Sequence, residues 1–137
     1  MAKSPFSSLV REFSGNAIEA IDATFKGSLQ ELDERVKKRT PVDTGFLRNS
    51  WMASTVSMPA LTRDREIGGG VPSDNAGTIA AATFGEPFYF AYTAKYAPYL
   101  EYGARGREGV GMVRLSVQDW PQIVAAEAKT AKSRFGV

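Results

Sequence analysis

The chain has 137 residues, a length that suits one domain built around one hydrophobic core. It contains neither cysteine nor histidine, which excludes disulfides, thiolate or histidine-ligated metal sites, a cysteine nucleophile and any histidine-based triad. The 17 basic and 15 acidic residues leave a net charge of +2, too small a surplus for a strong nucleic-acid footprint. We therefore expect a single domain over residues 1–137 that holds no metal and no cofactor.

The sequence shows no sign of membrane insertion or export. No apolar run approaches the roughly 20 residues that a membrane-spanning helix needs. The first residues, MAKSPFSSLVREF, lack the apolar core and the small-residue cleavage site of a signal peptide. We therefore expect a protein that is cytosolic at synthesis and has no membrane contact.

Residues 5–38 have the apolar spacing of one long helix. Pro5 suits a first helical turn, and Pro41 ends the helix by restricting the residue before it. Glycine is unfavourable inside a helix, so we expect a kink or a break at Gly15. Apolar side chains at spacings of three and four form one stripe along the segment: Phe6, Val10, Phe13, Ala17, Ile21, Phe25, Leu29, Leu32 and Val36.

The middle of the chain is expected to form a small antiparallel sheet. Residues 50–58 are rich in Ser, Thr and Val and predict a strand. Residues 78–84 and 88–93 flank a Gly-Glu-Pro turn signal and predict a β-hairpin. Residues 59–77, with their glycines and mixed charges, are typical of a long flexible loop.

A short helical turn is expected in KYAPYLEYG, because Pro98 lies near its start and Gly103 just past its end. The glycine-rich segment 103–111 follows and predicts a flexible loop that carries arginines.

The last segment favours a helix over residues 110–134 that is kinked or restarted near Pro121. Asp119 and Gln122 have the spacing of a capping box. The alternating apolar residues of 111–118 leave a strand as the alternative there. The predicted fold class is α+β: a long N-terminal helix and a C-terminal helix packed on one face of a small antiparallel β-sheet.

The segment RTPVDTGFLRNSW contains Asp43-Thr44-Gly45, the tripeptide of aspartic-protease active sites. That chemistry needs two paired carboxylates, so a homodimer would have to supply the second. The alternative is structural: Asp43 accepts backbone N–H bonds, Gly45 permits a tight bend, and Phe46 and Leu47 enter the core. We favour the structural interpretation because the tripeptide follows a charged helix and a proline rather than an apolar strand.

Two further clusters allow alternative interpretations. Tyr96, Tyr99, Tyr102 and Glu101 could form a catalytic or ligand site, but tyrosines of this kind are more typical of interfaces. Two groups of basic residues could contact phosphate. The first lies beside acidic residues near the end of the long helix and consists of Arg35, Lys37, Lys38 and Arg39. The second consists of Arg105 and Arg107 in the later glycine-rich loop. The GGGVP stretch lacks the lysine of a phosphate-binding loop.

The order of these elements, with two motifs, resembles the small tail-completion proteins of long-tailed bacteriophages, also described as minor tail or neck proteins. The resemblance covers roughly residues 5–134 by element order, and the insertion at 59–77 departs from the pattern. The motifs are P-x-D-T-G-x-L-x-x-S, present as Pro41, Asp43, Thr44, Gly45, Leu47 and Ser50, and Y-A-x-x-x-E-x-G, present as Tyr96, Ala97, Glu101 and Gly103.

The resemblance implies a structural virion protein of the head–tail joint, not an enzyme. Members of the family form rings that complete the tail and join it to the capsid connector. By this resemblance we expect this chain to form a homo-oligomer, as a hexameric ring. We expect the ring to contact the tail tube or tail terminator on one side and the capsid connector on the other. DNA would pass the lumen without specific binding. A tail-terminator or head–tail-adaptor tier, a nucleic-acid-binding module and a homodimeric aspartyl hydrolase remain the alternatives. The first motif is interpreted as a structural elbow, and the expected interface is Tyr96, Tyr99, Glu101, Tyr102, Gly103, Arg105 and Arg107.

Overall fold

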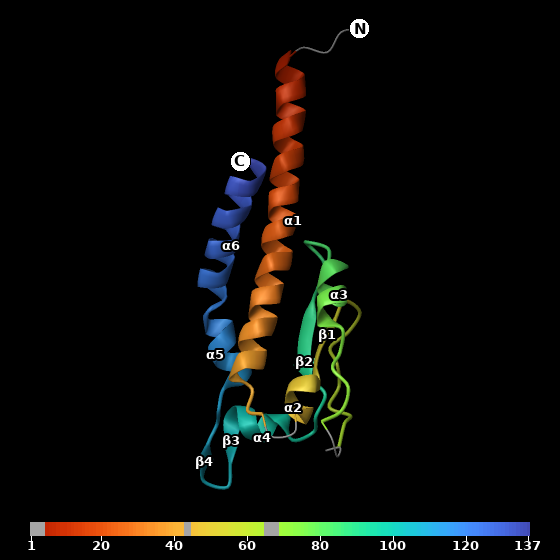
Figure 1. Ribbon diagram of the computed structural model, residues 1–137, viewed down its shortest axis with the longest axis vertical. Helices are drawn as coiled ribbons and strands as arrows, with labels where there is room; N and C mark the ends of the chain where they lie inside the picture. Colours follow the sequence, from red (N-terminus) through yellow and green to blue (C-terminus); the bar gives the residue numbers. More distant parts are fainter. Residues whose placement is uncertain (1–4, 43–44, 65–68) are drawn as a thin grey trace.

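A computed structural model of the chain describes residues 5–42, 45–64 and 69–137. Its main element is α1 (Pro5–Arg39), a helix of 35 residues that runs along most of the length of the molecule, with residues 97–108, which form α4 and the β3–β4 hairpin, beyond its C-terminal end (Figure 1). The kink expected at Gly15 is absent: the helix is unbroken there, and the glycine faces open space. A single glycine costs only about 1 kcal/mol, which the long flanking turns can offset.

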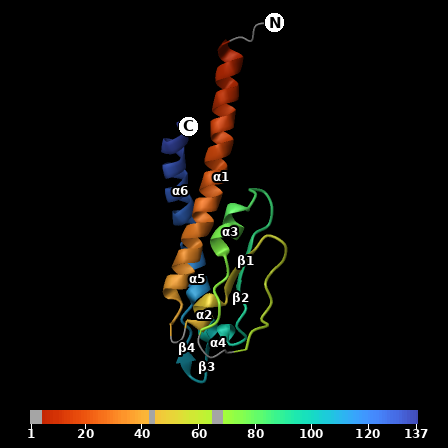
Figure 2. The same ribbon diagram turned by 45° about the vertical axis from the view of Figure 1, so that its right-hand side comes forward.

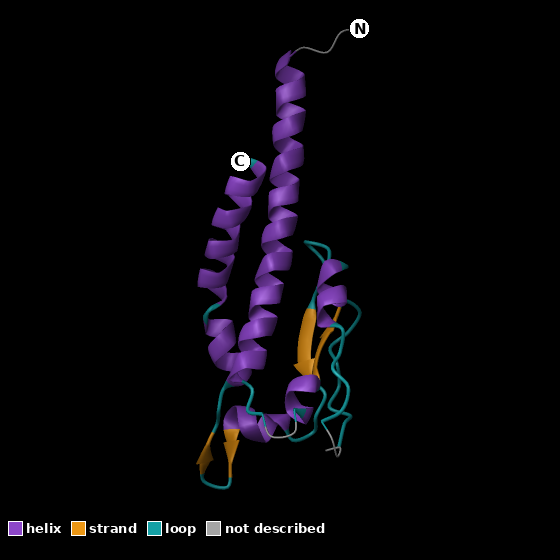
Figure 3. Cartoon of the chain, viewed as in Figure 1, coloured by secondary structure: helices purple, strands orange, loops and turns teal. Residues whose placement is uncertain are grey.

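The expected α+β class is confirmed (Figure 3). After α1 the elements are α2 (Phe46–Asn49), β1 (Trp51–Ser54), α3 (Asn75–Ala80), β2 (Tyr89–Tyr92), α4 (Ala97–Tyr102), β3 (Gly103–Ala104), β4 (Arg107–Glu108), α5 (Met112–Gln118) and α6 (Trp120–Phe135). None of the helices in the described ranges is both long and apolar enough to cross a membrane.

The main sheet consists of β1 and β2, which pair antiparallel with Trp51 opposite Tyr92. β1 is shorter than the strand expected over 50–58, because the hydroxyl of Ser54 accepts the N–H groups of Val56 and Ser57 and turns the chain. Part of the expected long loop is ordered against this sheet, since Arg63 forms a parallel bridge with Ala94.

The strand predicted over 78–84 is wrong, and with it the hairpin. The chain instead forms the helix α3, whose first turn is capped by Asp74: its carboxylate accepts the Gly77 N–H at 3.0 Å. Ile79 on this helix is buried in a cluster with Leu29 of α1. The apolar pattern of this segment is too short to distinguish a helix from a strand. Its alanines favour a helix, and the Asp74 cap and the Ile79 contact stabilise that helix.

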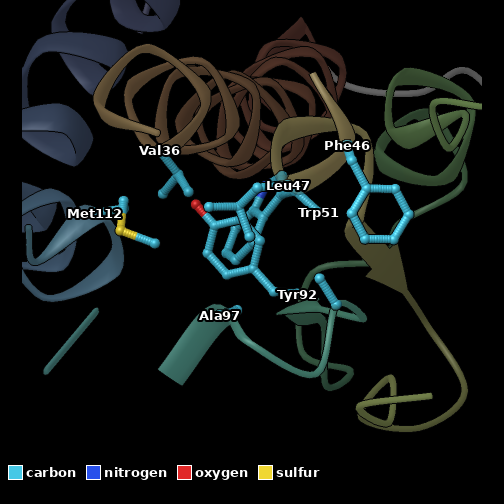
Figure 4. Close-up of a cluster of buried hydrophobic side chains, with 8 residues drawn as sticks. Val36, Phe46, Leu47, Trp51, Tyr92, Ala97 and Met112 are labelled. Carbon is cyan, nitrogen blue, oxygen red and sulfur yellow. The ribbon is translucent and has the colours of Figure 1, made fainter. Parts of the chain in front are cut away.

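α1 lies between two layers. α5 and α6 run along one side of it, and the β1–β2 sheet with α3 lies on the other side (Figures 1 and 2). The C-terminal helix therefore packs on α1 rather than directly on the sheet face. The main core gathers between α1, the sheet and the short helices, and Figure 4 shows its buried side chains: Val36, Phe46, Leu47, Trp51, Tyr92, Ala97 and Met112.

The expected helix restart near Pro121 is confirmed, because α5 ends at Gln118 and α6 begins at Trp120. The alternative of a strand over 111–118 is wrong. The capping box is also wrong: the Asp119 side chain makes no cap bond and instead accepts hydrogen bonds from the guanidinium groups of Arg35 and Arg39 on α1. The Asp119 carboxylate thus binds two arginines that are distant in sequence instead of the backbone N–H groups of its own helix.

A buried polar network ties α1 to the sheet layer. One oxygen of the Asp33 carboxylate accepts hydrogen bonds from the Trp51 indole N–H at 2.9 Å and from the Asn75 amide at 3.0 Å. The Asn75 side chain also bonds the backbone of β1 at Trp51 and Ala53. The other Asp33 oxygen pairs with Lys37 at 3.0 Å. The buried charge therefore has the full set of partners that such groups require.

Candidate functional site

The candidate site begins where α1 turns into α2 and β1, the segment interpreted above as an elbow. Thr40 closes α1: its hydroxyl donates to the Val36 carbonyl at 2.6 Å and lies 2.5 Å from the Tyr92 hydroxyl. Asp43 and Thr44 lie outside the described residues. Gly45 has φ +86°, a left-handed conformation that glycine adopts without strain, and it redirects the chain into α2.

The residues after Gly45 fix this turn to the core. Phe46 and Leu47 are 1% and 4% exposed. Ser50 is fully buried; its hydroxyl donates to the Leu47 carbonyl, and its own carbonyl accepts both the N–H and the hydroxyl of Thr93. Two hydrogen bonds from Thr93, the residue after β2, therefore join the turn to the sheet, and a third, from the Ser50 hydroxyl, closes the turn itself.

The second motif forms α4, and its glutamate faces the interior. The Glu101 carboxylate accepts the backbone N–H groups of Val113 and Arg114, each at 2.9 Å, at the start of α5. It also pairs with the Arg114 side chain at 3.2 Å and is 8% exposed. Glu101 thus serves as the N-terminal cap of α5 from a different helix, since the residue at the cap position, Gly111, has no side chain for this task.

The segment 103–111, expected as a flexible loop, contains the paired strands β3 and β4. Gly103 lies opposite Glu108, and a Cβ on Gly103 would come 2.5 Å from the Arg107 carbonyl oxygen. The tip of this hairpin carries Arg105, which has a left-handed φ of +53°. Glycine at 103 is therefore required by the close approach of the two strands, and the hairpin holds its arginines in a defined place.

The structure brings the two motifs together around one cavity of about 790 Å³. The elbow supplies one wall, α4 supplies aromatic rings, and the β3–β4 hairpin supplies two guanidinium groups. Tyr96 stacks on Phe46 with ring centroids 6.0 Å apart, and Tyr99 is 65% exposed at the rim. The lining residues are Pro41, Val42, Gly45, Phe46, Leu47, Tyr96, Tyr99, Leu100, Arg105 and Arg107.

Two of the residues expected at the interface lie on the other side of α4. Glu101 is occupied within the subunit, as described, and Tyr102 lies with its ring 5.2 Å from the Arg114 guanidinium carbon. Tyr102 is nevertheless 69% exposed. The expected interface is therefore divided: Tyr96, Tyr99, Arg105 and Arg107 share the cavity, whereas Tyr102 faces away from it with α5.

The chemistry of the cavity suits docking. Among the described residues, its lining combines aromatic rings and aliphatic side chains with two arginines and contains no carboxylate. Tyrosine and arginine are the side chains that protein interfaces use most as anchors. Within ranges 5–42, 45–64 and 69–137, no group of three or more acidic residues is placed to hold a metal ion.

The basic run at the end of α1 is engaged inside the subunit. Arg35 and Arg39 both bind Asp119 at 3.1 Å, and Lys37 binds Asp33. Partial burial of Asp119 opposes its ionisation, but the hydrogen bonds and charges of the two arginines outweigh it and lower the pKa of this carboxyl. Of the four basic residues, Lys38 alone has no acidic partner among those described and is exposed, so this run does not form an open phosphate-binding surface.

One feature was missed by the sequence interpretation, which described a single apolar stripe along α1 and did not distinguish its two ends. The structure leaves its first part exposed, with Phe6 75% and Phe13 60% accessible. Helix length could have revealed this. A helix of 35 residues is ~52 Å long, whereas a compact 137-residue domain has a radius of gyration of only about 14 Å.

An elongated subunit with an exposed apolar helix and an aromatic, arginine-bearing cavity has the features of a protein that works by docking to others. Residues 8–103 match the family model described as "Bacteriophage HK97-gp10, putative tail-component", and the chain belongs to this family of phage tail components. The match spans α1, the elbow and α4 up to Gly103. Searches of curated proteins and of solved structures gave no match.

Proposed function

We propose that this tail component is the ring-forming subunit that completes the tail and joins it to the capsid connector. The observation that carries the proposal is the cavity in which the elbow and the β3–β4 hairpin meet, in a chain of a phage tail-component family. Its arginines and tyrosines suit an acidic, partly apolar partner surface, such as a connector or tail-tube subunit offers. A hexamer would match the symmetry of the tail tube.

Ring formation requires two different surfaces on each copy, so that contacts run head to tail and close. One candidate is the exposed apolar stripe at the N-terminal end of α1, which lies far from α2 and α4, the helices beside the cavity (Figure 1). The internal pairing of the basic run at the end of α1 supports a lumen in which DNA passes without strong binding.

The direct test mixes purified protein with tails that lack it and with DNA-filled heads, and counts joined particles by negative-stain imaging. Wild-type protein should restore joining. Tyr99→Ala with Arg105→Glu should reduce it strongly, because both changes alter the cavity rim. Tyr102→Ala is the matched control: it changes an equally exposed tyrosine of the same helix outside the cavity. Normal joining by the double variant would exclude the cavity as the docking site.

Two further measurements test the ring and the lumen. Light scattering with size-exclusion chromatography should show a hexamer, alone or with tails; a monomer under both conditions would contradict the proposal. Retention on a DNA column should be slight at physiological salt. Tight binding that weakens steeply with salt would instead support the nucleic-acid-binding alternative.

A further inference from the structure

The N-terminal part of α1 extends beyond the rest of the molecule. Its first turns pass the end of α6 and have no neighbouring element in either view (Figures 1 and 2). Residues 5–16, defined here as the overhang, form ~18 Å of helix. Their large apolar side chains are exposed: Phe6 75%, Leu9 63%, Val10 46% and Phe13 60%. Such a continuous apolar stripe on an isolated helix is normally covered by a partner.

The polar residues of this part of α1 are arranged around the stripe as in an interface core. The charged residues between positions 5 and 24 are Arg11, Glu12, Glu19 and Asp22. At about 100° per residue, Arg11, Glu19 and Asp22 project to the face opposite Phe6 and Phe13, and Glu12 projects sideways. The stripe itself carries no charged side chain. Depletion of charge is what distinguishes the centre of a protein interface from the remaining surface.

The same face of α1 continues into an apolar groove of about 550 Å³ between α1, α6 and Phe84. On α1 it is lined by the small residues Ala17, Ala20, Thr24 and Ser28, with the larger Ile21 and Phe25 beside them. Its walls are apolar and aromatic, with Phe84 on one side and Trp120, Val124 and Ala128 on the other. Lys132 is the charged residue among those that line the groove.

Overhang and groove complement one another in size. The stripe carries large side chains from Phe6 to Phe13 over ~10 Å, while four small residues spaced from Ala17 to Ser28 line the groove over ~16 Å. Large side chains of one helix pack well into the spaces above small side chains of another. The overhang cannot enter the groove of its own subunit, because both belong to the same straight helix.

We propose that the overhang of one subunit docks into the α1–α6 groove of a second copy of this chain. Each copy carries one overhang and one groove, so each can contact two neighbours, as the contacts of a closed ring do. The inference rests on the ring function proposed above and specifies the surfaces that join the copies to one another. The cavity beside the elbow remains available for the tail or the connector.

Cysteine cross-linking tests this contact directly, because the natural chain has no cysteine. Phe13→Cys and Ala128→Cys are made as two separate full-length variants, one with an affinity tag, then mixed and mildly oxidised. A mixed disulfide between them can form only between copies. We expect it to form about tenfold faster than the disulfide between Arg11→Cys, on the opposite face of the overhang, and Ala128→Cys. Equal rates for both pairs, or no mixed product, would overturn the proposal.

A charge variant provides the second test. Phe13→Glu should abolish the self-association seen for wild type in light scattering, because it places a carboxylate in an apolar groove. Ser8→Glu, on the opposite face, should leave self-association unchanged, and both variants should melt like wild type because both side chains are exposed.

The outcomes separate this inference from the ring function. Unchanged assembly of Phe13→Glu would refute the overhang contact and leave the ring to another surface. A selective cross-link in an assembly of only two subunits would support the contact and refute the ring. A wild-type protein that stays monomeric up to the highest soluble concentration, with no cross-link, would show that another protein covers the overhang and would refute the inference.

Discussion

The two ends of α1 have the same sequence pattern and opposite surroundings. At the C-terminal end, Val36 is fully buried among side chains from five other elements, and Thr40 is bonded to the sheet. At the N-terminal end, Phe6 and Phe13 continue the same stripe with nothing packed on them. The difference teaches that apolar periodicity marks a face that will be covered, but does not tell whether the cover belongs to the same chain.

The largest expected effect contrasts one phenylalanine near each end. Phe46→Ala should lower the free energy of unfolding by about 3–5 kcal/mol, because it leaves a cavity beside the elbow. Phe13→Ala should change it by less than about 0.5 kcal/mol, because the ring is exposed in the single subunit. Urea titration at concentrations where the protein is monomeric measures both. Similar losses for the two variants would mean that the overhang is packed within its own subunit.

Glu101→Ala should cost about 1–3 kcal/mol, because it leaves two partly buried backbone N–H groups of α5 without their acceptor. Glu101→Gln should recover part of this loss, since an amide oxygen can still accept one of the bonds. Thermal melting followed by circular dichroism gives the difference. If neither variant is destabilised while head–tail joining fails, Glu101 acts on a partner and not on α5.

Tyr92 packs near the buried C-terminal end of α1, and its ionisation makes the stability of this region depend on pH. Burial raises the pKa of Tyr92 to about 12, with a smaller increase from the charge of Glu101 and an opposing hydrogen bond from Thr40. The stabilisation is complete below pH ~10, the pKa of tyrosine in the unfolded chain, and is lost as the pH rises towards 12.

Tyr92→Phe should therefore cost about 1 kcal/mol at pH 7 through the lost hydrogen bond. Between pH 10 and 12 its stability should fall less steeply than that of wild type, by up to about 1.4 kcal/mol per pH unit. Urea titrations across this range make the comparison. Parallel curves for the two proteins would show that the Tyr92 hydroxyl is accessible to water in the folded state.

The smallest expected effect concerns Asp119, which joins α1 to the start of α6. Its lowered pKa means that its contribution is present above pH 3.8, the value in the unfolded chain, and is lost as the pH falls through the lowered folded value. Asp119→Asn should melt slightly below wild type at pH 7. The difference should close on acidification below pH 3.8, as wild-type Asp119 becomes protonated. A difference that persists at pH 2 would point to packing instead of charge.

The elements predicted correctly are those that local pattern decides. The stripe of α1, the proline after it and the break before α6 depend on spacing and backbone restrictions that are visible in the sequence. Gly45 is similar, since its left-handed φ follows from the sharp turn between two apolar runs. These features need no knowledge of distant partners.

The errors concern residues whose partners lie far away in the chain. The segment that forms α3 depends on burial of Ile79 against Leu29, fifty positions earlier, and its short apolar pattern fits a strand equally well. Asp119 has the spacing of a local cap and binds α1 instead. Glu101 lies on α4, and its spacing in the motif does not indicate that its carboxylate caps α5. Local sequence patterns do not show which distant residues will pack against these side chains, so they could not predict these contacts.

The placement of the two tryptophans gives the molecule two built-in optical probes. Trp51 is 2% exposed, with its indole N–H bound to Asp33, so its emission should report whether the subunit is folded. Trp120 lines the groove, so its emission should shift to shorter wavelength when a second copy enters and displaces water. Exchanging either indole for phenylalanine isolates the other signal, and folding and docking can then be followed separately in one unlabelled sample.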